Sequence, residues 1–66
     1  MTTSEDTLLT PEEAAQYLRL PVRQLQQMRY LGRGPAYCHV GRAVRYSMAD
    51  VQRWVTAGRV EPQGAA

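Results

Sequence analysis

The stretch VRQLQQMRYL, residues 22–31, has the spacing of an amphipathic helix. At about 100° of rotation per residue, Leu25 and Met28 define one apolar edge, and Val22 lies beside it. The side chains that point the other way are Arg23, Gln27 and Tyr30, with Gln26 at their flank. This outer face is polar and contains no acid, so it suits the floor of a DNA groove. It would also suit plain water, and the rest of the chain must decide between the two.

The size and composition of the chain restrict what can stabilise it. It has 66 residues, enough for one small domain that buries only about 60% of its unfolded surface. Cys38 is the single cysteine and His39 the single histidine, so an intramolecular disulfide and a structural zinc site are both excluded. No apolar run approaches the roughly 20 residues that cross a bilayer, and the N-terminus does not resemble a signal peptide. We therefore expect a cytoplasmic protein without a membrane partner.

The charges are distributed unevenly along the chain. The formal net charge is +2, and all eight basic residues are arginines. Six of them lie between Ala14 and Ala49, an interval without an acid. A basic centre between acidic ends is typical of a surface that binds a polyanion. The alternative is a solvated basic face, which usually contains acids and lysines as well.

A strong helix start follows a polar N-terminal tail, residues 1–7, which we expect to be disordered. Thr10 is the predicted N-cap, Pro11 fits the first helical position, and Glu13 completes a capping box. The helix is predicted to run to about Leu18. Its inward residues are expected to be Ala14, Ala15 and Leu18.

A tight turn separates this helix from the stretch at 22–31. Pro21 removes a backbone donor and holds Leu20 in an extended conformation, so the second helix begins at Pro21 or Val22. Two helices joined by about three residues have helix-turn-helix spacing. An ordinary helical hairpin has the same spacing. Residues 32–35, with the sequence GRGP, are predicted to end the second helix in a loop.

A β-hairpin is predicted from Tyr37 to Tyr46, where the apolar period changes to two. A three-residue loop at 41–43 would pair Val40 with Val44, whereas a two-residue loop would pair Val40 with Ala43 and bury Arg45. Because the apolar face usually sets the register, we favour the longer loop, although such loops prefer glycine at their last position. The predicted inward residues are then Cys38, Val40, Val44 and Tyr46. His39 and Arg45 are predicted to lie opposite each other on the outer face, with Arg42 at the tip.

A third helix is predicted after Ser47, its N-cap, with Asp50 in the first turn. The inward stripe is predicted to contain Val51, Trp54 and Val55, with Trp54 as the largest residue of the core. Gly58 ends the helix, and residues 59–66 are expected to form a flexible tail. The fold class is therefore mainly α with a small β-hairpin: three helices and a two-stranded wing over residues 8–58.

Four segments carry a resemblance to a known family. They are LLTPEEAAQYL at 8–18, GRGPAY at 32–37, VGRAVRY at 40–46 and DVQRW at 50–54. Together they resemble the small MerR-type winged helix-turn-helix proteins of the phage excisionase and AlpA-like family. The resemblance covers residues 8–58. It implies binding to double-stranded DNA, with the second helix in the major groove and the hairpin as a wing on the backbone or in the minor groove.

The resemblance also implies which residues contact DNA. On the recognition helix these are Arg23, Gln24, Gln26, Gln27 and Tyr30. On the wing they are Arg42 and Arg45. Apart from the resemblance, the chemistry of the side chains makes His39 a further candidate on the wing and Arg19 and Arg33 candidate phosphate contacts. The family usually has Ser or Thr where Pro21 stands, and often arginines at positions 26 and 27. Glutamine pairs with adenine and arginine with guanine, while an arginine at a hairpin tip fits a narrow A·T-rich minor groove.

Two further residues of the second helix allow more than one interpretation. Arg29 lies near the apolar edge, where its stem could cover the core. Tyr30 could contact DNA or could pack on the loop at 32–35. Catalysis is not expected, because no nucleophile with a base, paired carboxylates or phosphate loop is present, and no cofactor or metal is expected.

Three functions are compatible with this surface. The first is an excisionase, or recombination directionality factor, that binds repeated sites cooperatively and bends DNA to direct a site-specific integrase. Head-to-tail self-association on DNA would supply the cooperativity. The second is a stand-alone transcriptional regulator of AlpA or MerR type. The third is a protein-interaction module that uses the basic face.

Overall fold

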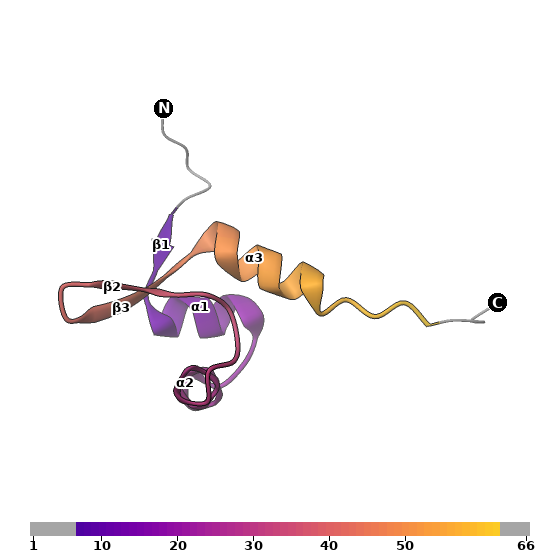
Figure 1. The fold of residues 1–66 in the computed structure, drawn as a ribbon, viewed down its shortest axis with the longest axis horizontal. Coiled ribbons are helices and arrows are strands. Elements are labelled where there is room, and N and C mark those ends of the chain that lie inside the picture. Colours follow the sequence, from indigo (N-terminus) through magenta and orange to yellow (C-terminus); the bar gives the residue numbers. More distant parts are fainter. Residues whose placement is uncertain (1–6, 63–66) are drawn as a thin grey trace.

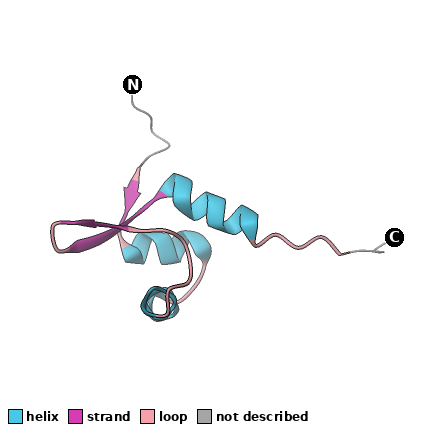
Figure 2. Cartoon of the chain, viewed as in Figure 1, coloured by secondary structure: helices cyan, strands magenta, loops and turns pink. Residues whose placement is uncertain are grey.

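The computed structural model, which describes residues 7–62, contains three helices and a small antiparallel sheet (Figure 1). The elements in chain order are β1 (Leu8–Leu9), α1 (Pro11–Leu18), α2 (Val22–Tyr30), β2 (Cys38–Val40), β3 (Ala43–Ser47) and α3 (Met48–Ala57). Figure 2 shows the same elements with helices in cyan and strands in magenta. The predicted class, mainly α with a β wing, is confirmed. Residues 1–6 and 63–66, which belong to the two predicted tails, lie outside the described residues.

Helix α1 begins as its sequence predicts. The N–H of Glu13 donates to Thr10 Oγ1, and the N–H of Thr10 donates to Glu13 Oε1, both at 3.0 Å. The helix ends at Arg19, which has a left-handed φ of 60° and donates its N–H to the Gln16 carbonyl at 3.1 Å. The Leu20 N–H then donates to the Ala15 carbonyl at 2.9 Å. This turn directs the chain into α2.

Helix α2 begins after Pro21, whose φ of −62° and ψ of 141° are those of an N-cap residue. No side chain caps its first turn within the described residues. Leu25 is fully buried, and Val22 and Met28 are half-buried against the core, as predicted. After the helix, the Arg33 N–H donates to the Met28 carbonyl at 2.7 Å. The loop therefore folds back over the last turn of α2.

The sheet has three strands in the order β1-β3-β2. Strand β1 was not predicted. It pairs Leu8 with Ser47 and Leu9 with Tyr46. The Met48 N–H donates to the Thr7 carbonyl at 2.9 Å, just beyond this pairing. The strand connects the N-terminal end of the described chain to the start of α3.

The predicted hairpin register is wrong by one residue. Val40 pairs with Ala43, so the loop contains only Gly41 and Arg42. Gly41 has a φ of +63° and Arg42 does not have a positive φ, which is the pattern of a type II′ turn with glycine at its first central position. This turn matches the right-handed twist of the strands, and its geometry decides the register.

The corrected register changes which residues face the core. Tyr46 is 1% exposed and Val44 is half-buried on the inner side. His39 lies opposite Val44, and Arg45 lies opposite Cys38, so the predicted pairing of His39 with Arg45 is wrong. Cys38 and Val40, predicted to be inward, are exposed because they lie on the other side of the hairpin.

The core lies where α1, α2, the sheet and the start of α3 meet. Its buried residues are Leu9, Ala14, Ala15, Leu25, Tyr46 and Val51. The Ser47 cap of α3 is confirmed, since the Asp50 N–H donates to Ser47 Oγ at 3.1 Å. Of the predicted stripe only Val51 is buried, while Trp54 is half-buried and Val55 is 48% exposed. The reason is that α3 packs chiefly on β3 and then extends away from the other helices (Figure 1). Tyr46, not Trp54, is the largest fully buried side chain.

Candidate nucleic-acid interface

The outer face of α2 is accessible along its whole length. Leu25, on the opposite side, is fully buried and fixes the rotation of the helix. The exposed residues of α2 are Arg23, Gln24, Gln26, Gln27 and Tyr30. Tyr30 is 88% exposed, so it does not pack on the loop at 32–35. All five residues assigned to a recognition helix therefore lie at the surface on one continuous element.

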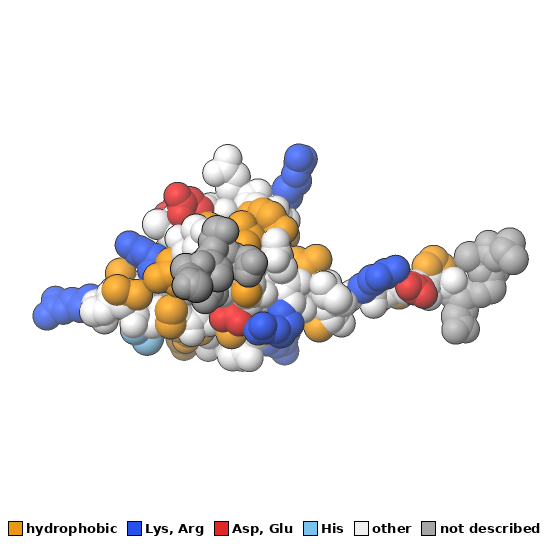
Figure 3. Space-filling model, turned by 90° about the horizontal axis from the view of Figure 1, so that it is seen from above, with side chains coloured by type: hydrophobic (Ala, Val, Ile, Leu, Met, Phe, Trp, Pro, Cys, Tyr) orange, Lys and Arg blue, Asp and Glu red, His pale blue; other side chains and the backbone are white. Residues whose placement is uncertain are grey.

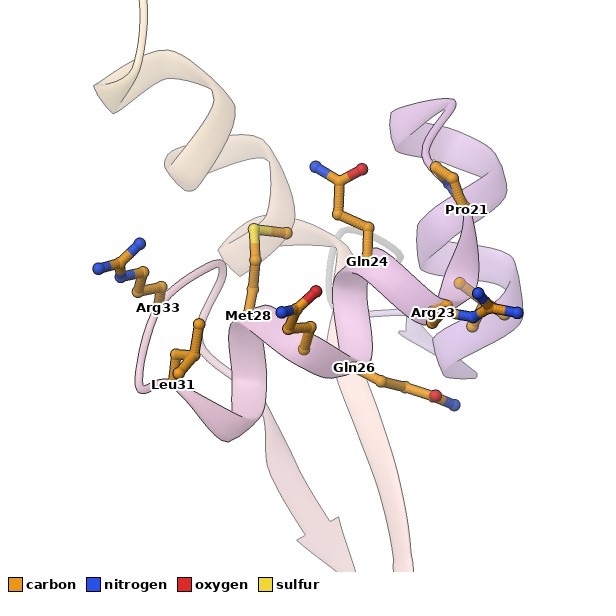
Figure 4. A pocket seen from close by; sticks show the side chains of 9 residues that line it. Pro21, Arg23, Gln24, Gln26, Met28, Leu31 and Arg33 are labelled. Atoms are coloured by element: carbon orange, nitrogen blue, oxygen red, sulfur yellow. The ribbon is translucent and has the colours of Figure 1, made fainter.

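A shallow hollow follows one flank of this helix (Figure 4). Met28 and Leu31 give it apolar surface, and Gln24 gives it an amide, while Arg23 and Arg33 stand toward its two ends. Figure 4 shows Gln24 and Met28 on the same side of α2, whereas Gln26 points to another side. Different glutamines of α2 therefore face different surroundings, which allows each to contact a different part of a ligand.

The hairpin carries the second group of predicted contacts. Arg42 is exposed at its tip, and His39 is exposed with its ring edge-on to Tyr37 at 5.7 Å between centroids. Arg45 is half-buried, and its Nη1 donates to the Val44 carbonyl at 2.8 Å. The hairpin projects from the body beyond α1 (Figure 1). Arg42 is thus the cation of the wing that can reach furthest into a groove.

The basic interval lacks neutralising partners. In the described part of the chain the only ion pairs are Arg53–Asp50 at 2.7 Å and Arg59–Glu61 at 2.8 Å, and both lie outside the acid-free interval. Within that interval, four exposed arginines make neither an ion pair nor a side-chain hydrogen bond: Arg19, Arg23, Arg33 and Arg42. Figure 3 shows basic side chains projecting at several points around the outline of the molecule. Unpaired cations of this kind attract a polyanion.

Arg29 contacts the sheet, a role that was not predicted from the sequence. Its Nη1 donates to Tyr46 Oη at 3.0 Å, and its guanidinium carbon lies 5.6 Å from the centroid of the Tyr37 ring. The available signal was its position four residues after Leu25, which places it on the inner side of α2. Tyr46 was predicted to face inward, but its contact with Arg29 and the position of Tyr37 beside it were not predicted.

Residues 7–62 contain neither a cluster of metal ligands nor a membrane-spanning helix. No group of three or more His, Cys, Asp or Glu residues there could hold a metal ion. Cys38 is exposed, and its Sγ lies 3.6 Å from the Arg45 carbonyl oxygen. No helix in this range is long and apolar enough to cross a membrane.

Comparison with known proteins agrees with this geometry. The model of a family described as a helix-turn-helix domain matches residues 8–59. The match extends from β1 through the last turn of α3 and so includes both α2 and the hairpin. No curated protein matches the chain. A helix-turn-helix domain is a DNA-binding domain, in which the second helix of the pair enters the major groove.

Proposed function

Because the chain belongs to the family of helix-turn-helix domains, we propose that it binds specific sequences of double-stranded DNA through α2 and the hairpin. One observation carries this proposal: the exposed face of α2 lies within an interval whose arginines have no acidic partner. An acid-free face of this kind can approach phosphates without repulsion. The alternative is a basic face that only contacts solvent. Such a face does not require four exposed arginines to remain unpaired.

The contacts divide by chemistry. Gln26, Gln27 and Arg23 lie on the exposed side of α2 and are proposed to contact base edges in the major groove, where glutamine pairs with adenine and arginine with guanine. Arg42 is proposed to enter the minor groove. Phosphate contacts are proposed for Arg19, Arg33 and Arg45. Further contacts with the DNA are proposed for Gln24, Tyr30 and His39.

We further propose an architectural role, that of an excisionase-like protein that bends DNA for a site-specific integrase. The helix-turn-helix family includes small excisionase-like and AlpA-like DNA-binding proteins, and the segments at 32–37 and 40–46 resemble them. A single small module buries about 600–1,000 Å² against DNA, and α2 has no side-chain cap to strengthen its first turn. Binding to one site is therefore expected to be weak, and head-to-tail self-association on adjacent sites would strengthen it.

The test begins with selection of duplex sequences from a random pool by the full chain. The selected site is then placed once, twice and three times in head-to-tail order, and binding is measured by gel shift. Cooperative binding predicts a lower half-saturation concentration per site as copies are added. Equal affinity per site would contradict self-association, and a failure to enrich any sequence would contradict specific binding.

A recombination assay then separates the two cellular roles. DNA carrying attachment sites is incubated with a site-specific integrase, with and without the protein, and excision products are counted. Stimulated excision supports the architectural role. Specific binding without any effect on recombination would instead favour a transcriptional regulator that uses the same surface.

A further inference from the structure

A single side chain connects α2 to the hairpin. Arg29 is half-buried on the inner flank of α2, and its Nη1 donates to Tyr46 Oη at 3.0 Å. Its guanidinium carbon lies 5.6 Å from the centroid of the Tyr37 ring, within the range of a cation–π contact. The rings of Tyr37 and Tyr46 are 5.9 Å apart. We call this set of contacts the Arg29 link.

The Arg29 link adds a polar contact to the apolar core that α2 and β3 share through Leu25 and Tyr46. Helix α2 packs chiefly on α1, and β3 packs on α1, β1 and α3. Between α2 and the hairpin, the Arg29–Tyr46 contact is the only hydrogen bond among residues 7–62. No backbone hydrogen bond joins the two elements in this range, so the Arg29 link is the directional contact between them.

We infer that Arg29 is a positioning residue, which sets the orientation of the hairpin relative to α2. The inference rests on the proposed function, in which both elements contact one duplex. Two elements that contact the same duplex bind more tightly when their relative orientation is fixed beforehand, because less freedom is lost on binding. The Arg29 link supplies this fixed orientation from within the protein.

The competing explanation is that Arg29 contacts a phosphate directly. A substitution at Tyr46 distinguishes this explanation from the positioning role. Tyr46 is 1% exposed, so it does not reach DNA. The Tyr46→Phe substitution removes only the hydroxyl that accepts from Arg29 and leaves the charge and the ring in place. An effect of this substitution on DNA binding must therefore be transmitted through the Arg29 link.

Binding is measured for the wild type, Tyr46→Phe, Arg29→Met and the double variant over a range of salt concentrations. Loss of one hydrogen bond worth about 1 kcal/mol predicts roughly fivefold weaker binding by Tyr46→Phe, with an unchanged salt slope. The double variant should bind no more weakly than Arg29→Met alone. A different result would show that Arg29 is a phosphate contact and that the inference is wrong: Tyr46→Phe binds as tightly as the wild type, while Arg29→Met brings the salt slope about 0.9 closer to zero.

A second measurement needs no DNA. Residual dipolar couplings of backbone amides report the orientation of α2 and of the hairpin in the free protein. One alignment tensor should fit both elements in the wild type, whereas Tyr46→Phe and Arg29→Met should each require a different or averaged orientation of the hairpin. Tyr17→Phe is the control, because it removes a hydroxyl from a side chain that is 48% exposed on α1. It should leave the couplings of α2 and of the hairpin unchanged.

The two proposals can fail separately. Unchanged couplings in Tyr46→Phe would overturn the positioning role even if the protein binds DNA well. Absence of DNA binding by the wild type would overturn the proposed function, while the couplings would still test the Arg29 link. Because Tyr46→Phe keeps the buried ring, it carries the test if Arg29→Met does not fold.

Discussion

Gly34 lies in the loop that leads from α2 to β2, with a φ of +86°. A Cβ at this position would lie 3.3 Å from Met28 Cβ and 3.7 Å from Met28 Cε. Glycine is therefore required at position 34 for two reasons: the positive φ of the backbone and the close approach of the loop to α2. The sequence signalled a loop here, but it could not show that the loop folds back onto Met28.

The Gly34→Ala substitution should therefore destabilise the fold without touching the proposed contacts. The left-handed conformation costs about 1–2 kcal/mol for a residue with a Cβ, and the contact with Met28 adds to this cost. We expect the free energy of unfolding to fall by about 2–3 kcal/mol, to be measured by urea denaturation.

Gly32 provides the matched control. It has a φ of +76°, but a Cβ there would meet no atom within 4 Å. Gly32→Ala should therefore show only the conformational cost, about 1–2 kcal/mol. Equal losses in the two variants would mean that the loop yields at Met28 and that the close approach has no energetic importance.

At the scale of elements, local chemistry predicted helix ends better than strand pairing. The capping box of α1 and the Ser47 cap of α3 depend on residues within one turn, and the structure has both. The hairpin register failed because the apolar-face rule needs one buried face, whereas all three residues of β2 are exposed. The turn preference of Gly41 decided the register instead. Strand β1 has only two residues, too few to show a period of two.

The next prediction concerns the different roles proposed for α2, which contacts bases, and for the hairpin tip, which contributes to binding of every sequence. Gln27 is exposed on α2, and Arg42 is exposed at the hairpin tip, so neither substitution to alanine should change stability by more than about 0.5 kcal/mol. Gln27→Ala should reduce the preference for one base pair by about 1–3 kcal/mol. Arg42→Ala should weaken binding to all sequences by a similar factor.

This prediction is checked by competition binding against a panel of duplexes, each with one base pair changed. Gln27→Ala should flatten the profile at one position, whereas Arg42→Ala should lower the whole profile and leave its shape. If both variants lose affinity uniformly, base contacts and backbone contacts are not separated between the two elements.

For the whole molecule, the order of elements and the distribution of charge were predictable, but the extent of the core was not. The caps, Pro21 and the glycine-rich loop delimit all three helices, so the fold class followed from the sequence. The burial of Trp54 could not be predicted, because helical spacing shows which residues share a face but not whether another element covers it. Roles within the interface depend on DNA geometry, which neither periodicity nor charge describes.

The uneven charge of the whole molecule predicts how binding responds to salt. If Arg19, Arg33 and Arg45 each neutralise one phosphate, the logarithm of the binding constant should fall with a slope of about −2.7 against the logarithm of salt concentration. Between 50 and 200 mM salt, affinity should then decrease roughly 40-fold. Fluorescence anisotropy with a labelled duplex measures this slope directly.

One substitution inside the acid-free interval and one outside it make the prediction specific. Arg33→Ala should bring the slope about 0.9 closer to zero, because one fewer counterion is released. Arg53→Ala should leave it unchanged, since Arg53 is already paired with Asp50 on α3 at 2.7 Å and lies outside the acid-free interval. An equal change in both variants would show that binding responds to total charge alone, and a slope near zero in the wild type would show that the arginines of the interval do not hold phosphates.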